Sequence, residues 1–171
     1  IVFGGNVSMN STGDRVAVGG NIGANNVNGA YSGAVRIFEW SGTDWLQIGT
    51  DIYGEAAYDY SGISIAMNNV GNRVAITSPY NDGNGTSSGH VRVFEWNGID
   101  WLKLGIDIDG DSVGNYNQYA QYTTVSMNSS GNTIAIGSLD SISDASGNNS
   151  SGHVRIYEWK GNAWTKKGSD I

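Results

Sequence analysis

Closely spaced acidic residues give this sequence its best candidate for a metal site. Asp107, Asp109 and Asp111 alternate with other residues along one short segment. Carboxylates and loop carbonyls together can supply the cage of oxygen ligands that Ca²⁺ prefers. Ca²⁺ is therefore a possible ligand here, and we expect no obligatory cofactor. The alternative is a solvated turn, because the similar stretch 51–55 contains only two acidic residues.

Tyrosines in an amide-rich segment form a second candidate site. Tyr116, Tyr119 and Tyr122 lie among asparagines and glutamines in segment 115–122. Aromatic rings can stack on a sugar while amide groups hydrogen-bond to its hydroxyls. These tyrosines are thus candidate ligand-binding residues for a carbohydrate. The alternative is an ordinary connection whose tyrosines pack inward.

The residues suited to acid–base or nucleophilic catalysis do not form a catalytic motif. Serine, histidine and aspartate are all present, but no G-x-S-x-G nucleophile elbow occurs. His90 and His153 occupy the same position in two similar segments, which favours a packing role. We therefore predict that the chain is not an enzyme. Recurring basic and acidic residues predict structural ion pairs between neighbouring sheets instead: Arg36 with Glu39, Arg92 with Glu95, and Arg155 with Glu158.

Glycosylation sequons point to an extracellular or cell-surface protein. This composition yields about three N-x-S/T sequons by chance, and six occur. The excess favours a secreted, glycosylated chain. The candidate acceptors are Asn6, Asn10, Asn84, Asn128, Asn148 and Asn149.

Composition and charge exclude several classes of partner. The formal net charge of −7 disfavours nucleic acid, because phosphate binding needs clustered lysine and arginine. No apolar run approaches the ~20 residues that span a bilayer. The chain lacks cysteine, so it has neither disulfides nor thiolate metal sites.

A threefold internal repeat governs the organisation of the chain. The segment SGAVRIFEWSGTDW, at 32–45, returns as SGHVRVFEWNGIDW at 88–101 and as SGHVRIYEWKGNAW at 151–164. The period is about 60 residues, which is typical of a repeat architecture. The chain is thus predicted to be a single domain, 1–171, with approximate repeats at 1–52, 53–108 and 109–171.

Each repeat reads as four short antiparallel strands. In the middle repeat, apolar alternation and turn residues predict strands at 63–67, 73–77, 90–96 and 101–108. Along the third strand, Phe94 and Trp96 should point to one face, and Val91 and Val93 to the other. Both faces then carry large apolar side chains, as a sheet between two other sheets requires. No segment shows a helical period, so we expect almost no helix.

Four-stranded antiparallel sheets repeated in this way are typical of β-propeller blades. We therefore predict an all-β fold, a β-propeller built of four-stranded antiparallel blades, with three blades in this chain. Propellers generally use about four to eight blades. Three blades leave two open edges, which should either continue into further blades or meet other copies of the same chain.

Short motifs in each repeat resemble the FG-GAP repeat family. They are Phe3-Gly4 before Val7-Ser8-Met9, Ser78-Pro79 after Val74-Ala75-Ile76, and the strand 89–94. The family is similar to the blades of integrin α-subunit propellers, so the resemblance implies a propeller fold and a surface or secreted protein. Its calcium loop lies between the first two strands. The turns at that position in this chain are 10–14, 68–72 and 128–132. They are too short and too poor in carboxylates to form the family's calcium site.

These observations together predict a non-enzymatic extracellular or cell-surface β-propeller module for structure, adhesion or ligand binding. The alternatives are a lectin-like carbohydrate-binding propeller and, from another class, a propeller-fold hydrolase or lyase. The expected partners are other blades or copies of the same chain, and a glycan or surface protein.

Overall fold

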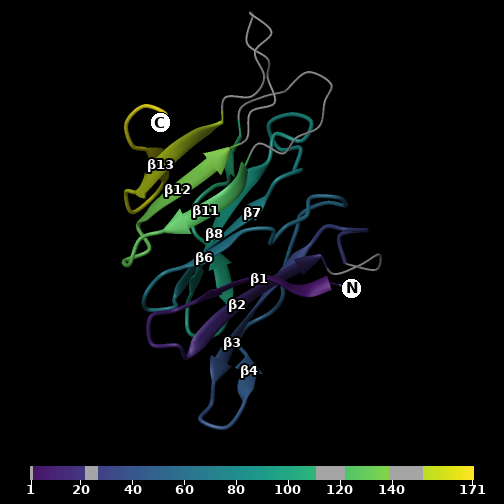
Figure 1. Cartoon of the computed structure of the whole chain (residues 1–171), viewed down its shortest axis with the longest axis vertical. Helices are drawn as coiled ribbons and strands as arrows, with labels where there is room; N and C mark the ends of the chain where they lie inside the picture. The colour runs from purple at the N-terminus through teal and green to yellow at the C-terminus, as the bar shows by residue number, and fades with distance from the viewer. Residues whose placement is uncertain (1, 22–26, 111–121, 139–151) are drawn as a thin grey trace, which may run out of the picture.

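Every regular element in the part of the chain that the structure describes is a β-strand (Figure 1). The structure is a computed structural model that describes residues 2–21, 27–110, 122–138 and 152–171. Within this part of the chain, no helix has the length and apolar character needed to cross a membrane. The all-β prediction is confirmed for these residues.

The strands form three antiparallel sheets, one for each repeat. Sheet 1 contains β1 (Val2–Met9), β2 (Arg15–Asn21), β3 (Ala34–Trp40), β4 (Trp45–Gln47) and β5 (Ile52–Tyr53). Sheet 2 contains β6 (Ile65–Met67), β7 (Arg73–Ser78), β8 (His90–Trp96), β9 (Trp101–Lys103) and β10 (Ile108–Asp109). Sheet 3 contains β11 (Tyr122–Met127), β12 (Thr133–Ser138), β13 (His153–Trp159) and β14 (Trp164–Lys166).

The predicted fourth strand of the middle repeat is wrong as one continuous strand. The stretch 101–108 is divided into β9 and β10, which both pair with β8. Gly105 lies between them with φ +85°, a left-handed conformation that ends an extended strand. Gly49 interrupts sheet 1 in the same way, with φ +72°. The described residues therefore contain fourteen strands rather than the expected twelve.

The three sheets stack in chain order, and side chains from facing sheets form two apolar cores. We call the face that packs on the preceding sheet the rear face, and the face that packs on the following sheet the front face. Phe94 and Trp96 of β8 lie in the core between sheets 1 and 2, whereas Val91 and Val93 lie in the core between sheets 2 and 3. The predicted two-faced strand is confirmed.

Stacked turns at one end hold the sheets in register. Asn68 closes its turn by accepting the backbone N–H groups of Asn72 and Arg73, at 3.0 and 2.9 Å. Asn10 and Asn128 do the same in their own repeats. The turns also bond to one another, because the Ser11 N–H donates to the Asn69 carbonyl and the Asn69 N–H to the Ser129 carbonyl.

Replacing Trp101 by alanine tests the core between sheets 1 and 2. Trp101 is buried there, so Trp101→Ala leaves a cavity and should cost about 3–5 kcal/mol of the free energy of unfolding. Urea denaturation measures this. Its neighbour Leu102 is exposed, so the control Leu102→Ala should cost less than about 1 kcal/mol. Similar losses for both variants would show that Trp101 is not a core residue.

Candidate functional site

A pair of tryptophans recurs at the same place in every sheet. Trp96 and Trp101 face each other across β8 and β9, with ring centroids 5.4 Å apart and an interplanar angle of 46°. The other pairs have nearly the same geometry, at 5.6 Å and 54° for Trp40–Trp45 and at 5.5 Å and 50° for Trp159–Trp164. The pair is thus a fixed feature of the repeat.

A left-handed glycine of the preceding sheet packs on this pair in sheets 2 and 3. A Cβ on Gly49 would lie 2.8 Å from Trp101 and 3.0 Å from Trp96, and one on Gly105 would lie 2.7 Å from Trp159. The indole N–H of the second tryptophan also donates to a carbonyl beside the glycine. Trp101 donates to Ile48 at 3.2 Å, and Trp164 donates to Leu104 at 2.9 Å.

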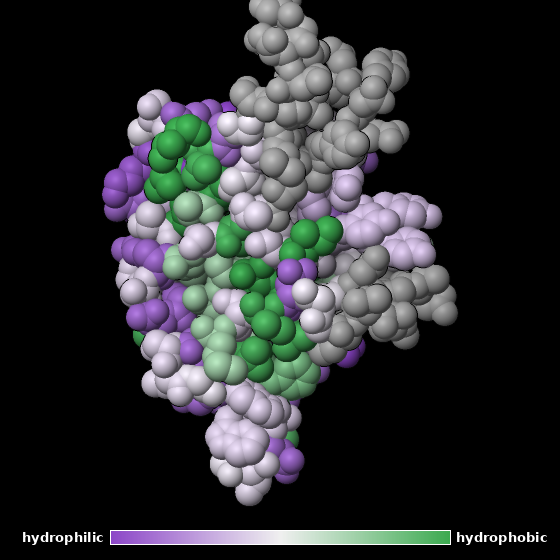
Figure 2. Space-filling view, viewed as in Figure 1, coloured by the Kyte–Doolittle hydropathy of each residue, from purple (hydrophilic) through white to green (hydrophobic). Residues whose placement is uncertain are grey.

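The rear face of sheet 1 carries the same side chains without a covering sheet among the described residues. Trp45 is 41% exposed, whereas its counterparts Trp101 and Trp164 are 6% and 9% exposed. Val7 and Met9 on β1 are also exposed, although Met67, the counterpart of Met9, is buried. Figure 2 shows green apolar side chains gathered over β1 and β2.

The front face of sheet 3 is open in the complementary way. Gly168 keeps the left-handed conformation, with φ +78°, but a Cβ there would meet nothing within 4 Å. Ile171 bonds to the backbone of Val154 as β5 bonds to β3. It is nevertheless 80% exposed, against 6% for its counterparts Ile52 and Ile108. The chain thus presents an uncovered tryptophan pair at one end and an unfilled glycine contact at the other.

The predicted arginine–glutamate ion pairs between sheets are wrong. Residues three apart on a strand point to opposite faces, so Arg92 and Glu95 cannot meet. Glu95 instead accepts from Arg73 at 2.8 Å, across β7 and β8 of one sheet. Glu39 pairs with Arg15 in the same manner. The arginines of the predicted pairs in sheets 1 and 3 bond to aspartates of their own sheets instead. Arg36 bonds to Asp51, and Arg155 bonds to Asp170.

The predicted acidic segment is only partly described. Asp107 pairs with Lys103 at 2.8 Å, and Asp109 lies at the end of β10. Burial, and then the nearby carboxylates of Asp107 and Glu55, raise the pKa of Asp109. Asp111 lies outside the described residues. The described group that could hold a metal ion joins Asp107 instead to two residues that sequence reasoning did not combine with it, Glu55 and His90.

The predicted tyrosine site mostly lies outside the described residues. This applies to Tyr116 and Tyr119, and Tyr122 is described only as a backbone position at the start of β11. The structure does contain a tyrosine cluster that sequence reasoning missed. It consists of Tyr31, Tyr58, Tyr60 and Tyr80, whose ring centroids are 5.3–5.8 Å apart between neighbours.

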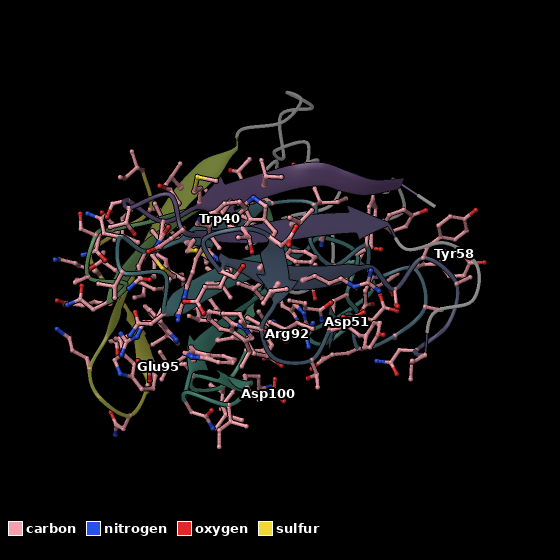
Figure 3. All side chains as sticks on the ribbon, turned by 90° about the horizontal axis from the view of Figure 1, so that it is seen from below. Trp40, Asp51, Tyr58, Arg92, Glu95 and Asp100 are labelled. Atoms are coloured by element: carbon pink, nitrogen blue, oxygen red, sulfur yellow. The ribbon has the colours of Figure 1, made fainter. Side chains whose placement is uncertain are left out.

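Three residues of this tyrosine cluster have an unusual backbone conformation. Tyr31, Tyr58 and Tyr60 have φ values of +57°, +68° and +53°, which are rare for bulky residues. Tyr31 and Tyr58 are exposed. Figure 3 shows Tyr58 at the opposite end of the molecule from Glu95. The cluster therefore presents an exposed aromatic surface at the end away from the stacked turns.

The predicted glycosylation acceptors differ in their accessibility. Asn84 and Asn128 are exposed and Asn6 is half-buried. Asn10 is buried, and its amide nitrogen donates to Thr12 and Asp14 at 3.0 and 2.6 Å. A glycan on Asn10 would break one of these contacts. Asn128 makes the equivalent pair to Ser130 and Asn132, at 3.1 and 2.9 Å, so neither acceptor fits its folded turn. Asn148 and Asn149 lie outside the described residues.

Comparisons with known proteins bear on the fold alone. No family model and no curated protein matches the chain. Among solved structures it is similar to the tricorn protease, a propeller-containing protein, with a TM-score of 0.54 and 10% sequence identity. The match covers 94% of this chain, which spans only 18% of the length of the tricorn protease chain. This likeness supports a propeller-like all-β arrangement.

Fluorescence quenching tests the exposure of the first tryptophan pair. Trp40 and Trp45 are exposed on the rear face of sheet 1, so acrylamide should quench them preferentially in a dilute sample. The double variant Trp40→Phe/Trp45→Phe should lose most of the readily quenched emission. The control Trp101→Phe/Trp164→Phe should retain it, because both of those residues are buried. Equal losses would contradict the assignment of the open face.

Proposed function

We propose that the chain is a non-enzymatic β-propeller module of the cell surface or extracellular space that assembles through its two open end faces. The covering sheet is either a further blade of the same protein or a second copy of the chain. In the second case, the front face of sheet 3 in one copy packs on the rear face of sheet 1 in the other. The proposal rests on the exposure of Trp45. Its counterparts in sheets 2 and 3, Trp101 and Trp164, are buried against the preceding sheet.

Three contacts of the internal junctions have matching residues at the two ends. Gly168 corresponds to Gly49 and Gly105, so it can pack on the Trp40–Trp45 pair. The Lys167 carbonyl corresponds to that of Ile48, which accepts the indole N–H of Trp101. Ser169 and Asp44 correspond to Thr50 and Asp100, which are hydrogen-bonded at 2.8–3.1 Å.

One internal contact has no equivalent between copies. Arg15 and Arg73 each donate to a turn carbonyl of the following sheet, at 3.2 Å. The corresponding residue of sheet 3 is Thr133, which is too short for this contact. The junction between copies should therefore be weaker than the junctions within the chain. Two copies joined at both ends give a ring of six blades, within the usual range of about four to eight.

The contacts of the recurring arginines also support a structural rather than a catalytic role. Arg15 and Arg73 each bond to a glutamate of their own sheet and reach a carbonyl of the next sheet. A catalytic group is needed once, whereas these groups recur with the repeat. The exposed sequon asparagine Asn84 supports the extracellular or cell-surface part of the proposal.

Light scattering tests the assembly. The purified chain should shift with concentration from one chain mass, 18.1 kDa, towards twice that value. Met9→Asp places a charge on the rear face of sheet 1, so this variant should remain a single chain. The control Ile99→Asp adds the same charge in the exposed β8–β9 turn and should still associate. A single chain mass at every concentration would overturn assembly between copies.

A second candidate function is carbohydrate binding at the tyrosine cluster. Exposed, preordered aromatic rings offer flat apolar surfaces on which a sugar ring can stack. Tyr58 is the most exposed of the four tyrosines. This candidate is the lectin-like alternative with a different binding site, the tyrosine cluster rather than segment 115–122.

Oligosaccharide titration tests this second candidate. If one ring face of Tyr58 contributes about 1 kcal/mol, Tyr58→Ala should weaken binding roughly fivefold or more. Val70→Ala removes an exposed apolar side chain from a stacked turn and should leave binding unchanged. Absence of binding by the unmodified chain across a glycan array would reject this candidate.

A further inference from the structure

His90 is a buried imidazole that lacks the usual hydrogen bonds. It is 1% exposed, and its Nε2 atom has no hydrogen-bond partner among the described residues. Its Nδ1 atom lies 4.0 Å from Glu55 Oε2, beyond hydrogen-bonding distance. Buried polar atoms normally have hydrogen-bond partners, so this imidazole is a candidate ligand for a bound ion.

Two carboxylates lie beside this imidazole. The ligand atoms of Glu55, His90 and Asp107 are all within 4.8 Å of one another. Glu55 comes from the connection after β5, His90 begins β8, and Asp107 precedes β10. The group therefore joins sheet 2 to the segment that leaves sheet 1.

We propose that Glu55, His90 and Asp107 bind a divalent transition metal ion, with Zn²⁺ as the best-fitting example. One imidazole nitrogen and two carboxylate oxygens, completed by water, form a ligand set that suits a tetrahedral ion of this class. Ca²⁺ prefers a larger, all-oxygen cage. The imidazole therefore separates this site from the calcium site predicted at 107–111.

Asp107 is not held by the arginine of its own sheet, unlike its counterparts in sheets 1 and 3, so it is more readily available to an ion. Asp51 and Asp170 occupy the same position in sheets 1 and 3, and each is bonded to the arginine of its own sheet. In sheet 2 that arginine is Arg92, which donates to the Tyr53 carbonyl at 2.7 Å instead. Asp107 instead forms an ion pair with Lys103, a half-exposed side chain that can turn away to release it.

Glu55 can serve the arginine and the ion with different oxygens. Its Oε1 atom lies 3.5 Å from Arg92, whereas Oε2 faces His90. Its exposed side chain can move the short distance needed to close around an ion with bonds of about 2.0–2.2 Å.

Calorimetric titration of the chelator-treated full chain with ZnCl₂ tests the site. We expect one equivalent to bind, and a hundredfold excess over the dissociation constant should raise the melting temperature by roughly 5–10 °C. His90→Gln and Glu55→Gln should each weaken binding more than about tenfold. Glu55→Gln is the safer variant for folding, because Glu55 is exposed. Asp51→Asn is the matched control, since Ala34 replaces the histidine in sheet 1, and it should bind normally.

Three results would overturn the proposal. The first is the absence of Zn²⁺ binding at millimolar concentration. The second is binding that both Glu55→Gln and His90→Gln leave unchanged. The third is preferential binding of Ca²⁺ that depends on Asp109 rather than on His90, which would favour the acidic segment instead. None of these results depends on whether copies of the chain associate.

Discussion

The packing of a tryptophan pair on a left-handed glycine of the preceding sheet is the contact on which the architecture depends. A β-sheet with two apolar faces cannot stand alone in water and needs a neighbour on each side. Sheet 2 has both neighbours, and every residue of β7 after Arg73 is buried. The strand β13 of sheet 3 contains no fully buried residue. Stability therefore belongs to the junctions between sheets, as in other repeat architectures.

Each repeat carries both halves of this contact, four residues apart. The pairs are Trp45 with Gly49, Trp101 with Gly105, and Trp164 with Gly168. The tryptophan packs towards the preceding sheet, and the glycine receives the tryptophan pair of the following sheet. The stack therefore has a direction. Any linear run of such repeats leaves one tryptophan pair and one glycine contact unused, at opposite ends.

The sequence was sufficient to predict most strands and their faces, but not the break in the fourth strand or the contacts of the charged side chains. Alternation along 90–96 correctly separated Phe94 and Trp96 from Val91 and Val93. The break at Gly105 was missed because a glycine inside an apolar run does not reveal its φ angle. The group formed by Glu55, His90 and Asp107 was missed because its members come from three separate segments. Pairing of β10 with β8 brings Asp107 to His90 within sheet 2, and the stacking of sheets adds Glu55.

Small differences between the repeats make the junctions unequal. The junction between sheets 1 and 2 has the Thr50–Asp100 hydrogen bonds, whereas Ile106 and Ala163 occupy those positions between sheets 2 and 3. A junction between copies would regain a polar pair in Ser169 and Asp44 but would lose the arginine contact at Thr133. In the proposed assembly, association between copies would therefore be weaker than the packing within one chain. It would depend on concentration, while each three-sheet unit would keep its own two internal junctions.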